Sequence, residues 1–223
     1  MIKIEETEDG SRTLFVPEMN EHYHSVKGAL TEAEHIFINM GLRQCTVPSP
    51  HVFEIGFGTG LNAFLTLLEA ERTGRKVYFS SIERYPVDIE TIQQMGYPEL
   101  IDATHSHEYY AMHEADWNRP VEITPHFVLH KIKGDLTSFI PEEKFDVVYF
   151  DAFAPEKQPE MWTDKVFEKI YTALNPQAIL TTYCAKGVIR RLLQSTGFTV
   201  ERLPGPPAGK REILRATKED RSY

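Results

Sequence analysis

The segment His51–Phe64, HVFEIGFGTGLNAF, decides the fold. It begins with a short apolar run that stops at Gly56, and glycines recur at positions 58 and 60 before apolar residues return at helical spacing from Leu61. This pattern is typical of a buried strand that enters a tight loop and then a helix. The glycines allow the backbone to approach a bound group closely, and the start of the helix offers free N–H groups. The segment therefore predicts a ligand-binding loop at the edge of a sheet.

Strand-like and helix-like segments alternate along the rest of the chain. Further strands are expected at 76–82, 145–150, 178–183, 198–203 and 212–217, and helices at 61–72, 87–95, 160–174 and 187–195. Strands that alternate with helices form a parallel sheet, because right-handed crossovers place the helices on both faces. We therefore predict a Rossmann-like α/β domain with a mostly parallel seven-stranded sheet and helices on both faces.

The chain is expected to hold one large domain, because 223 residues suit a single α/β unit better than two ordinary ones. We assign this domain to residues 48–218, with an N-terminal extension at 1–47 that belongs to the substrate side and a polar tail at 219–223. The alternation of strands and helices weakens at about 96–125, which predicts an insertion over the sheet edge.

Two local structures are predicted outside the regular pattern. In the N-terminal extension, Thr31–Met40 is expected to be helical, with Thr31 and Glu34 forming a capping box. At the end of the insertion, residues 121–123 and 127–132 are expected to pair as a hairpin around Pro125.

Composition limits the class of protein. No apolar run approaches the ~18 residues of a transmembrane helix and the first ten residues lack a signal region, so we expect a soluble cytoplasmic protein with no membrane partner. Cys45 and Cys184 lack the spacing of a zinc site or a disulfide framework. The net charge of -9 argues against a nucleic-acid substrate, although the last third of the chain is locally rich in Lys and Arg.

Carboxylates near the glycine loop favour one class of cofactor. Glu54 precedes the glycines, where it would repel a pyrophosphate but attract the cationic methionine end of S-adenosylmethionine. Glu83 is placed to accept hydrogen bonds from ribose hydroxyls, as in nicotinamide enzymes. Asp135 either receives the adenine amine or is only a polar strand terminus. We predict S-adenosyl-L-methionine as the cofactor, with contacts from Glu54, Gly56, Phe57, Gly58, Thr59, Gly60, Asn62, Glu83, Asp135 and Asp151.

The segment Asp151–Pro155, DAFAP, follows an apolar strand and should lie at the carboxyl edge of the sheet, where α/β folds bind ligands. A carboxylate there can position an alkyl amine, whose free pKa is near ~10.4, and accept its proton. We predict Asp151 and Phe153 as catalytic residues; the alternative is that Asp151 caps a loop or contacts the cofactor. Phe153, Met161 and Trp162 line the acceptor pocket or simply pack.

Direct methyl transfer requires no metal ion, and the sequence indicates none. His105, His107 and His113 match no spacing of a metal site and come with no clear partner carboxylates. We expect these histidines to lie on the surface or in a pocket.

Three longer motifs resemble the methyltransferase part of the MnmC family, which modifies the wobble uridine of tRNA, including its stand-alone forms. They are Glu54–Phe64 (EIGFGTGLNAF), Asp151–Trp162 (DAFAPEKQPEMW) and Lys210–Leu214 (KREIL), and a looser similarity extends to 23–25, 28–32 and 186–197. The resemblance implies the fold of class-I S-adenosylmethionine-dependent methyltransferases. It also implies conversion of 5-aminomethyl-(2-thio)uridine to 5-methylaminomethyl-(2-thio)uridine in the tRNA anticodon.

The resemblance further implies a partner and residue roles. The glycine loop and Glu83 would bind the cofactor, while Asp151 and Phe153 would face the methyl group and the acceptor. Contacts to the substrate or to tRNA are expected from Tyr23, His24, Trp162, Lys186, Arg190, Lys210 and Arg211. Some members are fused to an FAD-dependent oxidase that makes the aminomethyl precursor. Because this chain ends at Tyr223, we expect such an oxidase to be a separate protein or absent.

Other functions stay open at this point. A small-molecule amine or hydroxyl methyltransferase would share the fold, because fold and cofactor do not define the acceptor. A non-catalytic binding module could also keep the cofactor fold. A nicotinamide dehydrogenase is disfavoured, because Glu54 and the Asp151 motif have no ready role in hydride transfer.

Overall fold

An eight-stranded sheet forms the centre of the structure, a computed structural model that describes residues 2–207 and 209–220. Its strands are β4 (His51–Ile55), β5 (Val77–Glu83), β6 (Pro120–Thr124), β7 (Phe127–Lys133), β8 (Phe145–Phe150), β9 (Leu174–Thr182), β10 (Thr199–Pro204) and β11 (Glu212–Thr217). They lie in the order β10-β11-β9-β8-β4-β5-β7-β6. The five inner strands are parallel, whereas β10, β11 and β6 pair antiparallel with their neighbours.

The predicted mostly parallel α/β arrangement is confirmed, with eight strands where seven were expected. The additional strand is β6, which pairs antiparallel with β7 and extends that edge of the sheet. These two strands form the hairpin that was predicted around Pro125.

The order of the strands creates a crevice at the centre of the sheet. The chain moves outward from β4 through β5 to β7, then returns to β8 on the other side of β4 and continues to β9. Open α/β sheets bind ligands at such a switch point, beyond the carboxyl ends of the strands. The glycine loop follows β4 and Asp151 follows β8, so both sequence motifs meet there.

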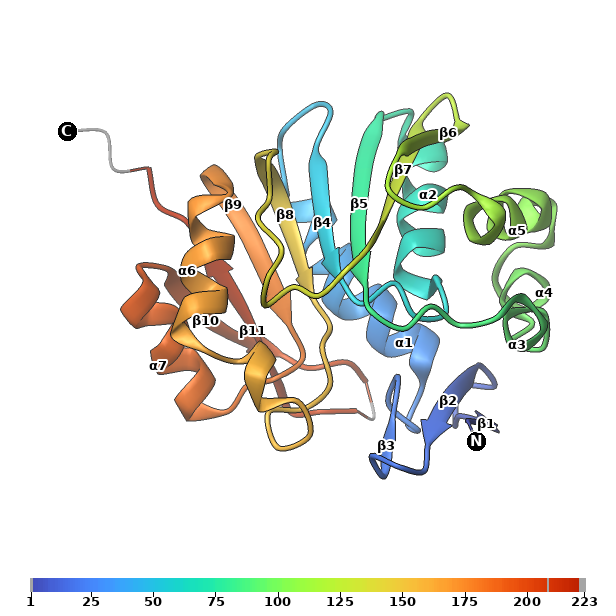
Figure 1. The fold of residues 1–223 in the computed structure, drawn as a ribbon, viewed down its shortest axis with the longest axis horizontal. Coiled ribbons are helices and arrows are strands. Elements are labelled where there is room, and N and C mark those ends of the chain that lie inside the picture. Colours follow the sequence, from blue (N-terminus) through green and yellow to red (C-terminus); the bar gives the residue numbers. More distant parts are fainter. Residues whose placement is uncertain (1, 208, 221–223) are drawn as a thin grey trace.

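Helices cover both faces of the sheet (Figure 1). They are α1 (Ala29–Ala33), the π-helix η1 (Glu34–Asn39), η2 (Leu42–Gln44), α2 (Leu61–Thr73), α3 (Ile89–Gln93), α4 (Tyr97–Ile101), η3 (Ala103–His105), α5 (Ser106–Glu114), η4 (Pro159–Met161), α6 (Asp164–Thr172) and α7 (Gly187–Thr196). Strand β8 is buried on both faces: Val147 and Tyr149 join the core under α1 and α2, and Val148 and Phe150 join the core under α6 and α7. This explains the continuous apolar run of β8.

The N-terminal extension forms a small sheet of its own, from β1 (Lys3–Glu6), β2 (Arg12–Val16) and β3 (Glu21–His22). Figure 1 places it beyond the carboxyl ends of the central strands. The predicted capping box is wrong, because Gly28 is the N-cap of α1 and Thr31 lies inside the helix. Asp9 from the β1–β2 turn replaces it, since its Oδ2 accepts the backbone N–H of Thr31 at 2.9 Å and its hydroxyl at 2.8 Å.

The predicted insertion holds α4, η3, α5 and β6, and it packs against the glycine loop. Tyr97 and Tyr109 are fully buried there. Tyr109 donates to the carbonyl oxygen of Thr59 at 2.9 Å, and Tyr97 donates to that of Arg12 at 2.7 Å. The insertion therefore links the glycine loop to the N-terminal sheet.

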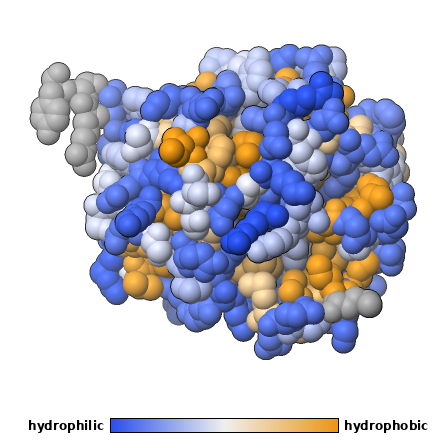
Figure 2. Space-filling model, in the orientation of Figure 1, coloured by the Kyte–Doolittle hydropathy of each residue, from blue (hydrophilic) through white to orange (hydrophobic). Residues whose placement is uncertain are grey.

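The surface is largely hydrophilic on the face shown in Figure 2, where hydrophobic residues gather in several separate patches. Cys45 and Cys184 are both buried free thiols. No helix within residues 2–207 and 209–220 is long and apolar enough to cross a membrane.

Candidate active site

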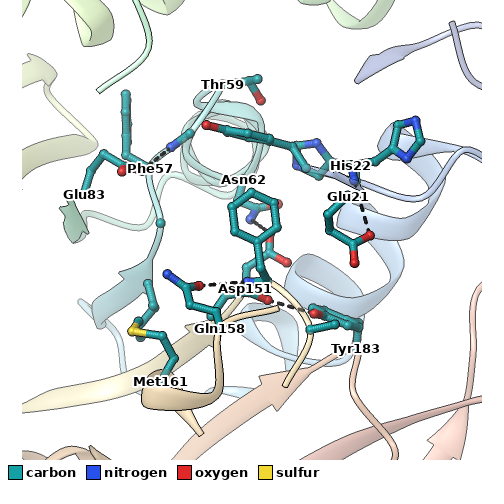
Figure 3. Close-up of a pocket in the computed structure, with 18 of the residues that line it drawn as sticks. Glu21, His22, Phe57, Thr59, Asn62, Glu83, Asp151, Gln158, Met161 and Tyr183 are labelled. Atoms are coloured by element: carbon teal, nitrogen blue, oxygen red, sulfur yellow. Dashed lines mark hydrogen bonds between the residues drawn. The ribbon is translucent and has the colours of Figure 1, made fainter. Parts of the chain in front are cut away.

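A cavity of about 420 Å³ opens at the switch point of the sheet. Its walls come from residues 21–26 of the N-terminal extension, the glycine loop, the ends of β5 and β7, and the segment after β8. Figure 3 shows Glu83 and Phe57 at one end, Tyr183 at the other, and Asn62 and Asp151 between them. This volume falls in the range of small-molecule and cofactor sites.

The glycine loop is held in a conformation that excludes side chains. Gly60 has a φ of 72°, and a Cβ built on it would lie 2.7 Å from His113 Nε2. Gly58 donates its backbone N–H to Glu83 Oε2 at 3.1 Å, and Tyr85 donates to Oε1 of the same carboxylate at 2.7 Å. Glu83 thus lines the cavity and also braces the loop.

Asp135 lies beside Glu83 on the same wall of the cavity. Its Oδ2 pairs with Arg84 at 2.8 Å, and its Oδ1 accepts the N–H of Thr137 at 2.8 Å. Hydrogen bonds from Thr137 lower the pKa of Asp135, and Arg84 adds to this effect. Asp135 is therefore an ionised acceptor at neutral pH, as the adenine role requires.

Glu54 lies beneath the glycine loop rather than in the cavity wall. It is fully buried, and its Oε2 accepts the Ser81 hydroxyl at 2.6 Å. Burial raises the pKa of Glu54 well above its ordinary value. Among the described atoms its Oε1 has no hydrogen-bond partner, and neither has Oδ1 of the adjacent cavity residue Asn62.

These features fit S-adenosylmethionine. Two carboxylates, Glu83 and Asp135, line the cavity at the ends of the neighbouring strands β5 and β7, and they are the residues that we predicted to contact ribose and adenine. Asn62 lines the cavity, and its Oδ1 has no hydrogen-bond partner among the described atoms, so the amino group of the methionine end would complete its hydrogen bonding.

Asp151 stands where the two ends of the cavity meet. Its Oδ2 accepts the side-chain N–H of Asn62 at 2.9 Å. Burial raises the pKa of Asp151 to about 7, while the Asn62 hydrogen bond and the Lys210 ammonium oppose this shift. A carboxyl group with this pKa can exchange a proton near neutral pH.

Two aromatic residues, Tyr23 and Phe153, line the same cavity as Asp151. Tyr23 and Phe153 meet edge to face, with ring centroids 5.3 Å apart at 85°. Trp162 is only 6% exposed and does not line the cavity; its Nε1 donates to the carbonyl oxygen of Phe153 at 2.8 Å. Trp162 therefore positions the Phe153 loop instead of touching an acceptor.

Burial also affects His24, which lines the cavity next to Tyr23. Burial lowers the pKa of His24 to about 4, although nearby Glu32 opposes the shift. His24 is thus a neutral side chain at physiological pH.

The sequence did not identify Glu32, Tyr183 and Gln158, which also line the cavity. Gln158 Oε1 accepts the N–H of Phe153 at 3.3 Å. Tyr183 could have been found from its place at the carboxyl end of β9. For Glu32, the looser motif similarity at 28–32 was the only signal in the sequence. Glu32 lies in α1, and the packing of this helix brings its side chain to the cavity.

Most of the expected RNA-contacting residues lie outside the cavity. Lys186 pairs with Glu156 on the surface, and Arg190 and Arg211 are absent from the cavity lining. Among the basic residues expected to contact the substrate or tRNA, Lys210 alone lines the cavity, as Tyr23 and His24 do, and it pairs with Glu32. Within the described residues no group of three or more His, Cys, Asp or Glu side chains could hold a metal ion.

One known protein family has a model that matches this chain. Residues 102–219, more than half of the chain, match a family described as S-adenosyl-L-methionine-dependent methyltransferase.

Relatives with assigned names are similar over most of this chain. It is 33% identical over 208 residues to the tRNA 5-methylaminomethyl-2-thiouridine biosynthesis bifunctional protein MnmC of Pseudomonas fluorescens, covering 86% of this chain and 31% of that protein. The protein of the same name from Cupriavidus necator is 32% identical over 205 residues, with coverage of 86% and 31%. The chain spans about a third of the length of these relatives.

Two solved structures share the fold. MnmC2 from Aquifex aeolicus has a TM-score of 0.79 at 22% identity, covering 98% of this chain and 70% of that one. Spermidine synthase from Thermotoga maritima has a TM-score of 0.54 at 15% identity, with coverage of 97% and 72%.

Proposed function

We propose that this chain, which belongs to the family of S-adenosyl-L-methionine-dependent methyltransferases, methylates the 5-aminomethyl group of (2-thio)uridine at the wobble position of tRNA. The observation that carries the proposal is Asp151, a carboxyl group with a pKa of about 7 between the cofactor and acceptor ends of one cavity. The name of the MnmC relatives supports the choice of product, 5-methylaminomethyl-2-thiouridine.

The residues of the cavity have separate tasks in this reaction. When bound, S-adenosylmethionine supplies a methyl group on a positively charged sulfur. Glu83 and Asp135 would hold its ribose and adenine, and the glycine loop its methionine end. Tyr23 and Phe153 enclose the acceptor and exclude water.

Asp151 handles the proton of the acceptor. A primary alkyl amine must become neutral before its lone pair can form the new N–C bond. Asp151 takes this proton on a carboxylate oxygen, while Asn62 keeps the carboxylate in place. Orientation by these contacts supplies the rest of the rate enhancement, because displacement at a methyl group depends on alignment.

We propose that tRNA docks on the C-terminal third of the chain. Residues 186–215 contain seven basic residues, of which Lys186, Arg202, Lys210 and Arg215 pair with carboxylates. Among the described residues, Arg190, Arg191 and Arg211 form no ion pair and are free to meet phosphates. A tRNA whose wobble uridine already carries an aminomethyl group is the proposed substrate.

The test is transfer of labelled methyl from S-adenosylmethionine to tRNA purified from cells that lack this gene, followed by nucleoside analysis. Label in 5-methylaminomethyluridine or its 2-thio form is the expected result. If cofactor binds normally but no tRNA acquires label, the acceptor is a small molecule and the proposal fails.

A further inference from the structure

Lys210 directs its side chain into the cavity. Its Nζ donates to Glu32 Oε2 at 2.9 Å and lies 4.3 Å from the centroid of the Tyr183 ring. All three residues line the cavity that also contains Asp151. A primary ammonium is thus held between a carboxylate and an aromatic face.

The proposed acceptor carries the same chemical group as Lys210. A lysine side chain and an aminomethyl group both end in CH2–NH3+, and alkyl amines with a pKa near ~10.4 are protonated at neutral pH. Carboxylates bind such a cation through charge-assisted hydrogen bonds, and aromatic faces attract it. We infer that Glu32 and the face of Tyr183 form the subsite that binds the acceptor ammonium, and that Lys210 occupies this subsite in the free protein. The inference rests on the proposed function.

Glu32 and Tyr183 are fixed in place. The Glu32 side chain is 9% exposed, and its Oε1 accepts the backbone N–H of Ser25 at 3.3 Å. The Tyr183 hydroxyl donates to the carbonyl oxygen of Ala152 at 2.8 Å. Both walls of the subsite therefore stay in position when Lys210 leaves.

Lys210 is the movable member. It lies between β10 and β11, its side chain is 41% exposed, and its flexible stem allows the ammonium to turn toward solvent. Its departure would leave Glu32 as a buried carboxylate without a partner, which is strongly unfavourable. Lys210 therefore exchanges readily only for another cation, and the subsite selects an ammonium over a neutral hydroxyl.

Glu32 and Asp151 act in sequence on the acceptor. Glu32 binds the incoming ammonium, and Asp151 then accepts its proton so that the neutral amine can react. Lys210 competes with the acceptor for binding to Glu32, and it does not affect the proton transfer to Asp151. If Lys210 fills the subsite about 90% of the time, it weakens acceptor binding about tenfold.

Calorimetry with a nucleoside tests the inference without tRNA. The probe is 5-aminomethyluridine, with 5-hydroxymethyluridine as its neutral counterpart, titrated into protein saturated with S-adenosylhomocysteine. Lys210→Met should bind 5-aminomethyluridine about tenfold more tightly than the wild type and leave 5-hydroxymethyluridine unchanged. Glu32→Gln should weaken 5-aminomethyluridine binding by about tenfold or more, because the charged acceptor is lost.

Lys76→Met is the matched control. Lys76 also pairs with a glutamate, Glu122, at 2.9 Å and lies over a tyrosine ring, but outside the cavity. It should not alter binding of either nucleoside. Unchanged or weaker 5-aminomethyluridine binding by Lys210→Met would overturn the inference. If Lys210→Met binds 5-aminomethyluridine more tightly but the wild-type protein does not methylate tRNA, the subsite stands and only the proposed RNA substrate is refuted.

Discussion

Asp151 is the residue on which the chemistry depends. Asp151→Asn keeps the shape of the side chain but cannot accept a proton from the amine. We expect kcat to fall by roughly 10²–10⁴-fold, the range of general acid–base catalysis, with S-adenosylmethionine affinity retained. Single-turnover methylation and calorimetry measure the two quantities. An unchanged kcat would instead favour a function in which Asp151 only shapes the cavity.

Asn62 sets the pH at which Asp151 works. Its hydrogen bond lowers the pKa of Asp151, against burial, which raises it to about 7. In Asn62→Ala the pKa should rise further, so the ionised base appears at higher pH and the rising limb of kcat/KM moves to more alkaline pH. Asn175→Ala is the control, because Asn175 makes the same kind of hydrogen bond, 2.8 Å to Asp146, outside the cavity. Coincident profiles for the wild type and Asn62→Ala would exclude this coupling.

Glu83 combines a contact to the proposed cofactor with support of the glycine loop. Glu83→Ala removes a charged hydrogen-bond acceptor and frees the N–H of Gly58. We expect S-adenosylmethionine binding to weaken by roughly 1.5–3 kcal/mol, the scale of a hydrogen bond to a charged group. Calorimetric titration measures this loss, and wild-type affinity would remove Glu83 from the site.

Among the structural elements, the glycine loop packs closely against helix α5 of the insertion. Gly60→Ala brings a Cβ to 2.7 Å from His113 Nε2, at a φ of 72°. We expect a loss of more than about 1 kcal/mol of unfolding free energy, together with weaker cofactor binding. Thermal and denaturant unfolding measure the first effect.

Gly74→Ala separates backbone strain from contact with His113 as causes of the stability loss in Gly60→Ala. Gly74 has a nearly identical φ of 69°, but a Cβ at this position would have no atom within 4 Å. Its variant should lose stability through backbone strain alone and keep its cofactor affinity. Equal losses in the two variants would mean that contact with His113 contributes nothing.

Regular elements of the central sheet could be predicted because their sequence pattern is local. The apolar run of β8 and the capping of α2 by Gly74 are examples. Strands β1–β3 have only two to five residues, and in β2 the adjacent Thr13 and Leu14 are both buried, so these strands carry no usable alternation. The capping box failed because the cap of α1 comes from Asp9, far from the helix in sequence.

In the site, residues within one continuous motif could be predicted, whereas contacts between residues far apart in the sequence could not. The glycine loop and the Asp151 motif are continuous segments, and the fold brings them together at the switch point. The pairing of Lys210 with Glu32 joins residues 178 positions apart, which one sequence without an alignment cannot reveal. The expectation that Lys210 contacts the substrate or tRNA stays a prediction, and its pairing with Glu32 is what the sequence could not indicate.

At the scale of the whole molecule, the proposed function requires an acidic protein to bind an acidic polymer. The net charge is -9, so the proposed contacts depend on local arginines instead of the overall field. Changing Arg190, Arg191 and Arg211 together to Ala should raise KM for tRNA and flatten its dependence on log salt by roughly 0.7–0.9 per lost phosphate contact. S-adenosylmethionine affinity should not change.

A matched surface arginine controls for the loss of charge. Arg119 pairs with Asp116 in the insertion, outside the cavity, and Arg119→Ala should leave the salt slope as it is. If the triple variant also retains the wild-type slope, the tRNA docks on another face.

The small N-terminal sheet and the segment that follows it build one side of the cavity. Tyr23, His24 and Glu32 reach the cavity from outside the eight-stranded sheet, whereas strand β5 of that sheet supplies Glu83 and the loop after β7 supplies Asp135. Descent with modification can then act on the two parts at different rates. A related protein can carry a different N-terminal segment and methylate a different acceptor, while the residues proposed to bind the methyl donor stay the same.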